Sequence, residues 1–352
     1  MDLTTDAAFV DAVAEESGLL MESAPLGEDA VLRYLKLYYG LGGSLVRIPT
    51  EKDETFRLRD GDSTYLIKVS SPDEDPLIVN LQTACMEHLE RGAPDLPVQR
   101  IVKSTGRASE VLIPAPGRKY DRVLRVMRFM PGLLLANDRP SNGQIEQCGS
   151  VLARLSLALQ DFDHPRADRM LLWDLKHFHR MRPLLEYVQD PKKTALAVDI
   201  FDRFDAAVVP LQDSLTTQVI HGDFSPFNVL VDPDASGYVT GIIDFGDAVR
   251  SAVIFDISVA AANHLGADPE APWRQALKII DGYRTVRPLP IQESEALAAA
   301  APARLLLRAL ITQWRAIQRP ETRDYLLSHS QPDWDRLAAT AAAPTPKVDL
   351  TG

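Results

Sequence analysis

The sequence is poor in cysteine, in aromatic residues and in positive charge. It contains 2 cysteines among 352 residues, aromatic residues make up 7%, and 38 Lys and Arg face 49 Asp and Glu. The resulting formal charge of −11 repels nucleic-acid phosphates and anionic membrane surfaces. We therefore expect neither a nucleic-acid partner nor a membrane partner.

Other absences concern location. The start of the chain, Met1 to Asp6, lacks the basic and then apolar pattern of an export signal, and no apolar run is long enough to span a bilayer. Cys85 and Cys148 lie in apolar, periodic surroundings, which is typical of buried thiols in a reducing compartment. These features predict a cytoplasmic protein. The sequence carries no signal for its oligomeric state.

The most informative segment is His221-Gly222-Asp223-Phe224-Ser225-Pro226-Phe227-Asn228. In kinases, the Asp of an Asp-x-x-x-x-Asn loop accepts the proton of the attacking hydroxyl, and the Asn carbonyl oxygen binds a metal ion on the nucleotide. Asp223 is therefore the candidate base and Asn228 a candidate metal ligand. We expect His221 to brace this loop by hydrogen bonding.

A second motif, Ile242-Ile243-Asp244-Phe245-Gly246, follows after a predicted hairpin. Its strands are residues 228–231 and 238–243, and the turn between them contains Asp, Pro, Ser and Gly. The hairpin should bring Asn228 and Asp244 to the same end, and Mg²⁺ prefers oxygen ligands of this kind. The pattern predicts ATP or GTP with Mg²⁺. Asp256, which opens a helical pattern, is interpreted as a cap or a partner of the catalytic loop.

These two motifs resemble the aminoglycoside phosphotransferase and choline kinase family. Softer signals, such as Leu172-Trp173-Asp174-Leu175 and Asp324-Tyr325-Leu326-Leu327-Ser328, are similar to its hydroxylysine kinase branch. The resemblance implies an α+β, bilobal, protein-kinase-like fold with a small antiparallel-sheet N-lobe and a mainly helical C-lobe. It implies a nucleotide-binding lobe with leading helices over residues 1–129 and a catalytic and substrate lobe over 130–340. Residues 341–352 are predicted to form a flexible tail.

The resemblance also assigns nucleotide contacts. Lys68 ends a strand pattern and should meet the α- and β-phosphates. Gln82 stands where the family usually has the Glu that holds this lysine, and Glu87 is available on the same helix. Thr55 replaces the usual Asn in the phosphate-covering turn, and backbone groups from Met127 to Phe129 should meet the adenine ring, unless this is an ordinary strand end.

The elements expected from periodicity follow the two lobes. The expected strands are residues 45–48, 55–58, 64–69, 98–101, 110–113 and 122–129. The expected helices are residues 7–20, 28–39, 77–91, 141–160, 167–180, 191–212, 253–265, 272–286 and 291–318. The alanine-rich segment 338–346 is interpreted as a frayed end that does not pack.

For the acceptor, the resemblance implies a small hydroxylated amine or amino acid. Candidate substrate residues are Asp247, beside the metal motif, and Arg308, Trp314 and Arg315 on a late helix that also carries Arg304. An Arg there could clamp an amino-acid carboxylate, although a solvated or paired helix face explains such residues too. The alternatives are an aminoglycoside or other antibiotic phosphotransferase, and a catalytically silent nucleotide-binding protein.

Overall fold

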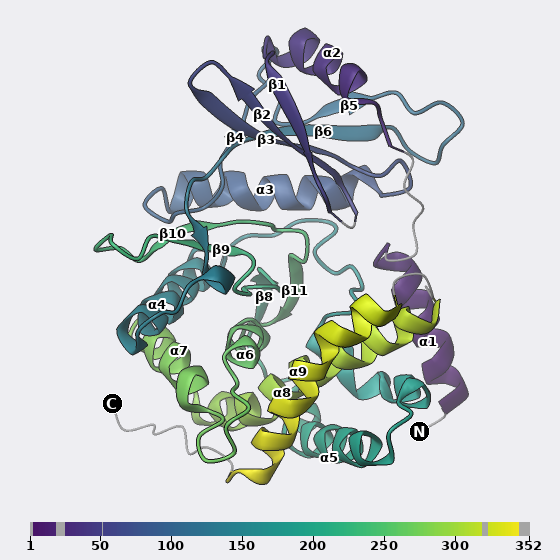
Figure 1. The fold of residues 1–352 in the computed structure, drawn as a ribbon, viewed down its shortest axis with the longest axis vertical. Helices are drawn as coiled ribbons and strands as arrows, with labels where there is room; N and C mark the ends of the chain where they lie inside the picture. Colours follow the sequence, from purple (N-terminus) through teal and green to yellow (C-terminus); the bar gives the residue numbers. More distant parts are fainter. Residues whose placement is uncertain (1–2, 19–24, 51, 319–322, 345–352) are drawn as a thin grey trace.

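The computed structural model describes residues 3–18, 25–50, 52–318 and 323–344. It has a smaller lobe built on an antiparallel sheet and a larger lobe that is mainly helical (Figure 1). The predicted bilobal α+β fold is therefore confirmed. In the described part of the chain, no helix has both the length and the apolar character needed to cross a membrane.

The N-lobe sheet has 6 strands in the order β1-β2-β3-β6-β4, with β5 also paired to β6. All pairings are antiparallel, and the register between β2 and β3 places Thr55 opposite Lys68. The strands are β1 (Ser44–Ile48), β2 (Glu54–Asp60), β3 (Ser63–Val69), β4 (Ile101–Val102), β5 (Val111–Ile113) and β6 (Arg122–Arg128).

The two faces of this sheet have different neighbours because side chains alternate along a strand. Phe56 and Ile67 pack on one face against α2, in the smaller of two hydrophobic cores. Lys68 and Arg125 therefore point to the other face, where α3 lies between the sheet and the C-lobe (Figure 1). The two helices are α2 (Glu28–Tyr39) and α3 (Pro76–Gly92).

The larger hydrophobic core joins α3 to the C-lobe. Leu81 and Leu89 of α3 are buried in the same cluster as the C-lobe helices. Cys85 and Cys148 belong to this cluster as free thiols, and burial raises the pKa of both. Helix α3 thus lies between the N-lobe sheet and the C-lobe and packs into the larger core.

The C-lobe places its functional loops between short strands. A three-stranded sheet has the order β10-β9-β7, and β11 pairs with β8. These strands are β7 (Leu133–Leu134), β8 (Thr217–Ile220), β9 (Val229–Val231), β10 (Val239–Ile242) and β11 (Val249–Ala252). The surrounding helices are α4 (Asn142–Ala158), α5 (Pro191–Ala207), α6 (Val253–Asn263), α7 (Arg274–Arg284), α8 (Ile291–Gln318) and α9 (Arg323–Ala342), with 3₁₀ turns η1 (Leu135–Asn137), η2 (Leu175–Arg180), η3 (Arg182–Tyr187) and η4 (Val209–Leu211).

The first helix corrects the predicted division into lobes. Helix α1 (Leu3–Glu16) packs on the C-lobe and not beside the N-lobe sheet (Figure 1). Asp6 pairs with Arg180 at 3.0 Å, and the ring of Phe9 meets that of His177 edge-on at 5.3 Å. Because these contacts are long-range, local periodicity found the helix but could not place it.

Two other expectations are wrong. Residues 167–180 form turns and η2 instead of an α-helix, because backbone groups there bind distant residues: the N–H of Leu172 donates to Ser17 Oγ at 2.8 Å. The alanine-rich segment continues α9 to Ala342, with Ala339 and Thr340 buried. Of the predicted tail, residues 345–352 lie outside the described residues.

Candidate active site

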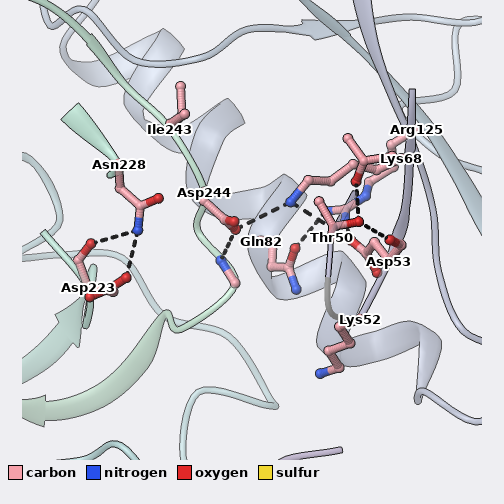
Figure 2. A network of polar contacts seen from close by, with 12 residues as sticks. Thr50, Lys52, Asp53, Lys68, Gln82, Arg125, Asp223, Asn228, Ile243 and Asp244 are labelled. Atoms are coloured by element: carbon pink, nitrogen blue, oxygen red, sulfur yellow. Dashed lines mark hydrogen bonds and ion pairs between the residues drawn. The ribbon is translucent and has the colours of Figure 1, made fainter. Parts of the chain in front are cut away.

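The loop between β8 and β9 holds Asp223 and Asn228 in direct contact. Asn228 Nδ2 donates to Asp223 Oδ2 at 2.7 Å and to the Asp223 carbonyl at 3.0 Å (Figure 2). Both N–H groups of the amide are thus used, which leaves its carbonyl oxygen on the side of Asp244 (Figure 2). Ser225 Oγ also donates to Asp223 Oδ2, at 3.3 Å. The other carboxylate oxygen, Oδ1, lies toward Arg304.

Buried residues brace this loop from behind. His221 is fully buried, accepts the backbone N–H of Asp223 at Nδ1 (3.3 Å) and contacts the Ile243 carbonyl through Nε2 (3.2 Å). Asp256, in the first turn of α6, accepts the N–H groups of His221 (3.2 Å) and Gly222 (3.0 Å). Burial raises the pKa of Asp256. The predictions that His221 braces the loop and that Asp256 is its partner are confirmed.

Gly222 is required at its position in this loop. Its φ of 80° lies in the left-handed region, and a Cβ there would stand 2.4 Å from the carbonyl oxygen of Asp247. The loop that carries Asp223 and the loop that follows Asp244 are thus in backbone contact.

The β9–β10 hairpin brings the two motifs together, as predicted. Val229 pairs with Ile242, and the N–H of Ile243 donates to the Asn228 carbonyl at 3.0 Å. The next residue, Asp244, has a φ of 61° and accepts the N–H of Gly246 at 3.0 Å. Such a backbone costs about 1 kcal/mol or more in a residue other than glycine, and such strain is concentrated at functional sites.

Lys68 faces Asp244 across the cleft between the lobes. Its Nζ lies 3.3 Å from Asp244 Oδ1 and 3.9 Å from Asp53 Oδ2 (Figure 2). The ammonium of Lys68 lowers the pKa of Asp244, against the opposing effect of burial. The structure therefore brings Asp223, Asn228, Asp244 and Lys68 to one place, as the sequence predicted from three separate segments.

The expected helix partner of Lys68 is wrong. Gln82 Oε1 accepts a hydrogen bond from Arg125 at 2.9 Å, and Glu87 pairs with Lys103. Lys68 is instead held by carboxylates outside α3.

The carboxylate on the N-lobe side is Asp53, in the turn between β1 and β2. Arg125, which is 1% exposed, holds Asp53 Oδ2 at 3.3 Å (Figure 2). Thr55 is buried nearby and accepts from Thr50 Oγ1 at 3.2 Å. The pair of Asp53 and Arg125 was missed because nothing in a sequence indicates that one turn carboxylate and one strand Arg share a partner.

An open groove of about 540 Å³ lies along the inner face of the sheet beside the connection between the lobes. It contains two exposed apolar side chains, Val46 (47%) and Phe129 (37%), which suit the flat face of a base. Met127 is buried in the larger core and does not line the groove. The groove is lined by Ser44, Val46, Arg57, Arg59, Asp62, Thr64, Phe129 and Pro131.

Two candidate substrate residues are engaged elsewhere. Arg308 donates to both oxygens of Asp333 at 2.7 Å and to Asn263 at 2.8 Å. Trp314 is 4% exposed and packs in the larger core. Arg315 is half-buried and lies about 16 Å along α8 from Arg304, at 1.5 Å per residue. Arg308 and Trp314 are therefore corrected, because helix packing and not an acceptor site explains them, whereas Arg315 stays a prediction.

Arg304, on the same helix, does reach the site. Its Nη2 lies 3.7 Å from Asp223 Oδ1, and its guanidinium stands 5.3 Å from the Trp173 ring centre. Asp247 is half-buried close to Asp223: burial and that neighbouring charge raise the pKa of Asp247, whereas Arg169 and Arg304 lower it.

Arg169 is a bracing residue that sequence reasoning did not find. It is buried and donates to the carbonyl groups of Ala248, at 3.1 Å, and Gly246. It thereby holds the backbone of the loop that follows Asp244. A single Arg in a segment without a motif carries no signal that could have identified it.

A family model described as a phosphotransferase enzyme family matches residues 45–289. The chain belongs to this phosphotransferase enzyme family. The match runs from β1 through both functional loops and ends before α8. The family, and the enzyme class of small-molecule kinase, agree with the sequence prediction.

Known proteins also resemble this phosphotransferase. Hydroxylysine kinase of Mus musculus is 23% identical over 311 residues, which cover 82% of each chain. A solved amicoumacin kinase in complex with AMP-PNP, Ca²⁺ and Ami has a TM-score of 0.70 at 16% identity, covering 91% of this chain and 96% of the other. A microcompartment-associated aminopropanol kinase has a TM-score of 0.68 at 18% identity, covering 91% and 100%. The two structures share the fold.

Proposed function

We propose that this phosphotransferase moves the γ-phosphoryl group of ATP or GTP to a hydroxyl of a small amine or amino acid of the hydroxylysine type. One observation carries the proposal. The amide of Asn228 is clamped on Asp223 while its carbonyl oxygen lies on the side of Asp244, which also meets Lys68. A base, two metal ligands and a phosphate-binding ammonium then surround one space.

Asp223 acts as the base in this proposal. Its Oδ2 is occupied by Asn228 and Ser225, so Oδ1 is the oxygen that would accept the proton of the acceptor hydroxyl. Oδ1 lies on the side of Arg304, and we place the acceptor there. Asp247, close to Asp223, would offer a second carboxyl group to an amine of the acceptor.

Asn228 and Asp244 would hold Mg²⁺ together with the nucleotide phosphates. Their donor atoms are an amide oxygen and a carboxylate, which fits a hard ion that binds few protein ligands and keeps phosphates and waters. Bound there, Mg²⁺ would neutralise charge on the transferred phosphoryl group. Lys68 would contact the α- and β-phosphates, and Thr55 would support the covering turn. The purine ring of the nucleotide would lie in the groove beside Phe129, next to the strand that carries Met127.

The test is a screen of ADP release with Mg·ATP and single acceptors: hydroxylysine, homoserine, ethanolamine, choline and a set of aminoglycosides. We expect turnover with a small amine or amino acid and none with aminoglycosides. Asp223→Asn should keep nucleotide affinity and lose about a thousandfold in turnover, because it removes the proton acceptor but not the clamp on Asn228.

The matched control is Asp234→Asn, an exposed residue of the hairpin turn, which should behave as the wild type. Normal turnover in Asp223→Asn would exclude Asp223 as the base. Turnover confined to aminoglycosides would replace the proposed acceptor class.

A further inference from the structure

Arg304 differs from Arg308, which lies on the same helix. It is 7% exposed, and its Nε and Nη1 are buried without a hydrogen-bond partner among the described residues. Its Nη2 approaches Asp223 Oδ1 at 3.7 Å, which is an ion pair but too long for a hydrogen bond. Buried polar groups in proteins are almost always hydrogen-bonded, so this guanidinium is missing a partner.

Arg308 shows what a satisfied arginine looks like in this environment. It lies one turn further along α8 and donates to Asp333 through two nitrogens and to Asn263 through the third. Within the part of the chain that the structure describes, no carboxylate accepts a hydrogen bond from Arg304; its close neighbours are Asp223, at 3.7 Å, and the face of Trp173, at 5.3 Å. Burial lowers the pKa of Arg304, whereas the carboxylates of Asp223 and Asp247 raise it, and a guanidinium stays charged.

The position of Arg304 indicates which ligand would accept its hydrogen bonds. The nucleotide side of Asp223 is its Oδ2, which meets Asn228, whereas Arg304 stands beside Oδ1. An anion bound by Arg304 would thus belong to the acceptor and not to the nucleotide phosphates. Arg304 also lies beyond residues 45–289, the part matched by the family model, so it belongs to the part of the chain in which acceptor recognition can differ from the family pattern.

We propose that Arg304 binds the carboxylate of the acceptor, so that the substrate is a hydroxylated amino acid and not a simple amino alcohol or an aminoglycoside. The inference rests on the proposed function and narrows it. A planar guanidinium binds a carboxylate with two parallel hydrogen bonds through Nη2 together with either Nε or Nη1, and among the described residues none of these three nitrogens of Arg304 makes a hydrogen bond. Binding there anchors the acceptor next to the oxygen that takes its proton.

The test uses acceptor pairs that differ only in the carboxylate. These are L-hydroxylysine and its decarboxylation product, and L-homoserine and its decarboxylation product 3-aminopropan-1-ol, with Mg·ATP and the full-length protein. In the wild type, the amino acid of at least one pair should have a kcat/KM about tenfold or more above its partner, the size expected of a charge-assisted hydrogen bond. Arg304→Gln should remove this preference mainly through KM and change the decarboxylated partner much less.

Arg308→Gln is the control, because it changes the same residue type on the same helix. It should lower thermal stability and leave the preference within each pair unchanged. A purely structural or electrostatic role of Arg304 toward Asp223 would instead reduce turnover of both members of a pair equally. That result, or equal use of both members by the wild type, overturns the inference.

Failure of the inference and failure of the proposed function are distinguishable. If no pair is phosphorylated but Mg·ATP is bound and slowly hydrolysed in an Asp223-dependent way, the amino-acid acceptor is wrong and the phosphotransfer site is retained. If Mg·ATP is neither bound nor hydrolysed, the proposed function fails and the inference fails with it.

Discussion

On the C-lobe side of the site, buried side chains hold the catalytic loop by its backbone, whereas on the N-lobe side the ammonium of Lys68 contacts the side chains of two carboxylates. His221 and Asp256 are both 0% exposed and bind four backbone groups of the two functional loops. Lys68 meets Asp53 at 3.9 Å and Asp244 at 3.3 Å, and the Asp244 side chain is 46% exposed. Water and salt weaken contacts of the second kind.

This difference separates the two tasks of the site. The base and the metal ligands require fixed geometry before substrates arrive, because misplacement raises the barrier to transfer. The lysine requires partners that it can exchange for phosphates when the nucleotide binds. Backbone hydrogen bonds to buried groups suit the first task, and an ion pair with the partly exposed side chain of Asp244 suits the second.

The largest expected effect is at Asp244, which contacts Lys68 and also belongs to the proposed metal site. Asp244→Ala removes a proposed metal ligand and the closest carboxylate to Lys68, so turnover should fall about a thousandfold. The gain in ATP affinity that Mg²⁺ provides should disappear with it. Nucleotide binding measured by calorimetry with and without Mg²⁺ checks this, and a persistent gain would place the metal elsewhere.

Removing the hydrogen bonds that hold the catalytic loop should affect stability as well as catalysis. Asp256→Ala leaves the N–H groups of His221 and Gly222 unpaired in a buried site, each at a cost of about 1–3 kcal/mol. We expect a lower free energy of unfolding in urea and about a tenfold or greater loss of kcat. Asp256→Asn, which keeps one acceptor oxygen, should lose less of both. Unchanged stability in Asp256→Ala would refute the bracing role.

The smallest expected effect is at Asp53, which contacts Lys68 on the N-lobe side. Asp53→Asn keeps an oxygen for Arg125 but removes the charge that competes with phosphates for Lys68. The Lys68–Asp53 contact of 3.9 Å is too long for a hydrogen bond, so its loss should cost little and affinity for the nucleotide should rise by up to about fivefold. Titration with a fluorescent ATP analogue measures this change. A fall in affinity would mean that Asp53 helps to hold Lys68 in its binding position.

The parts of the site that the sequence predicted share a common origin. Asp223, Asn228 and Asp244 are separated by short loops and one hairpin, and the register of that hairpin follows from turn residues and strand alternation. Lys68 was found from its place at the end of a strand pattern. Helices α2 and α8 begin and end at the predicted residues, Glu28–Tyr39 and Ile291–Gln318.

The wrong predictions share an origin too. The partner of Lys68, the role of Arg308 and the placement of α1 all depend on which of several charged or apolar groups meet after the lobes pack. Periodicity orders residues within one element, but it does not say which element lies opposite. The prediction for residues 167–180 failed for the same reason, since backbone N–H groups of Met170 and Leu172 donate to side chains of the distant helix α1 and the residue after it.

The sequence by itself determined the chemistry of this protein: a carboxylate base, oxygen ligands for a metal and a lysine for phosphates, because the spacing within one loop and one hairpin is a local property. Only the tertiary structure decided the rest. It assigned Asp53 and Arg125 to the lysine, buried Arg308 and Trp314 in helix contacts, and left Arg304 charged and without a hydrogen bond beside Asp223. These assignments depend on burial and on charges brought together from distant segments, and both exist only after the chain has packed.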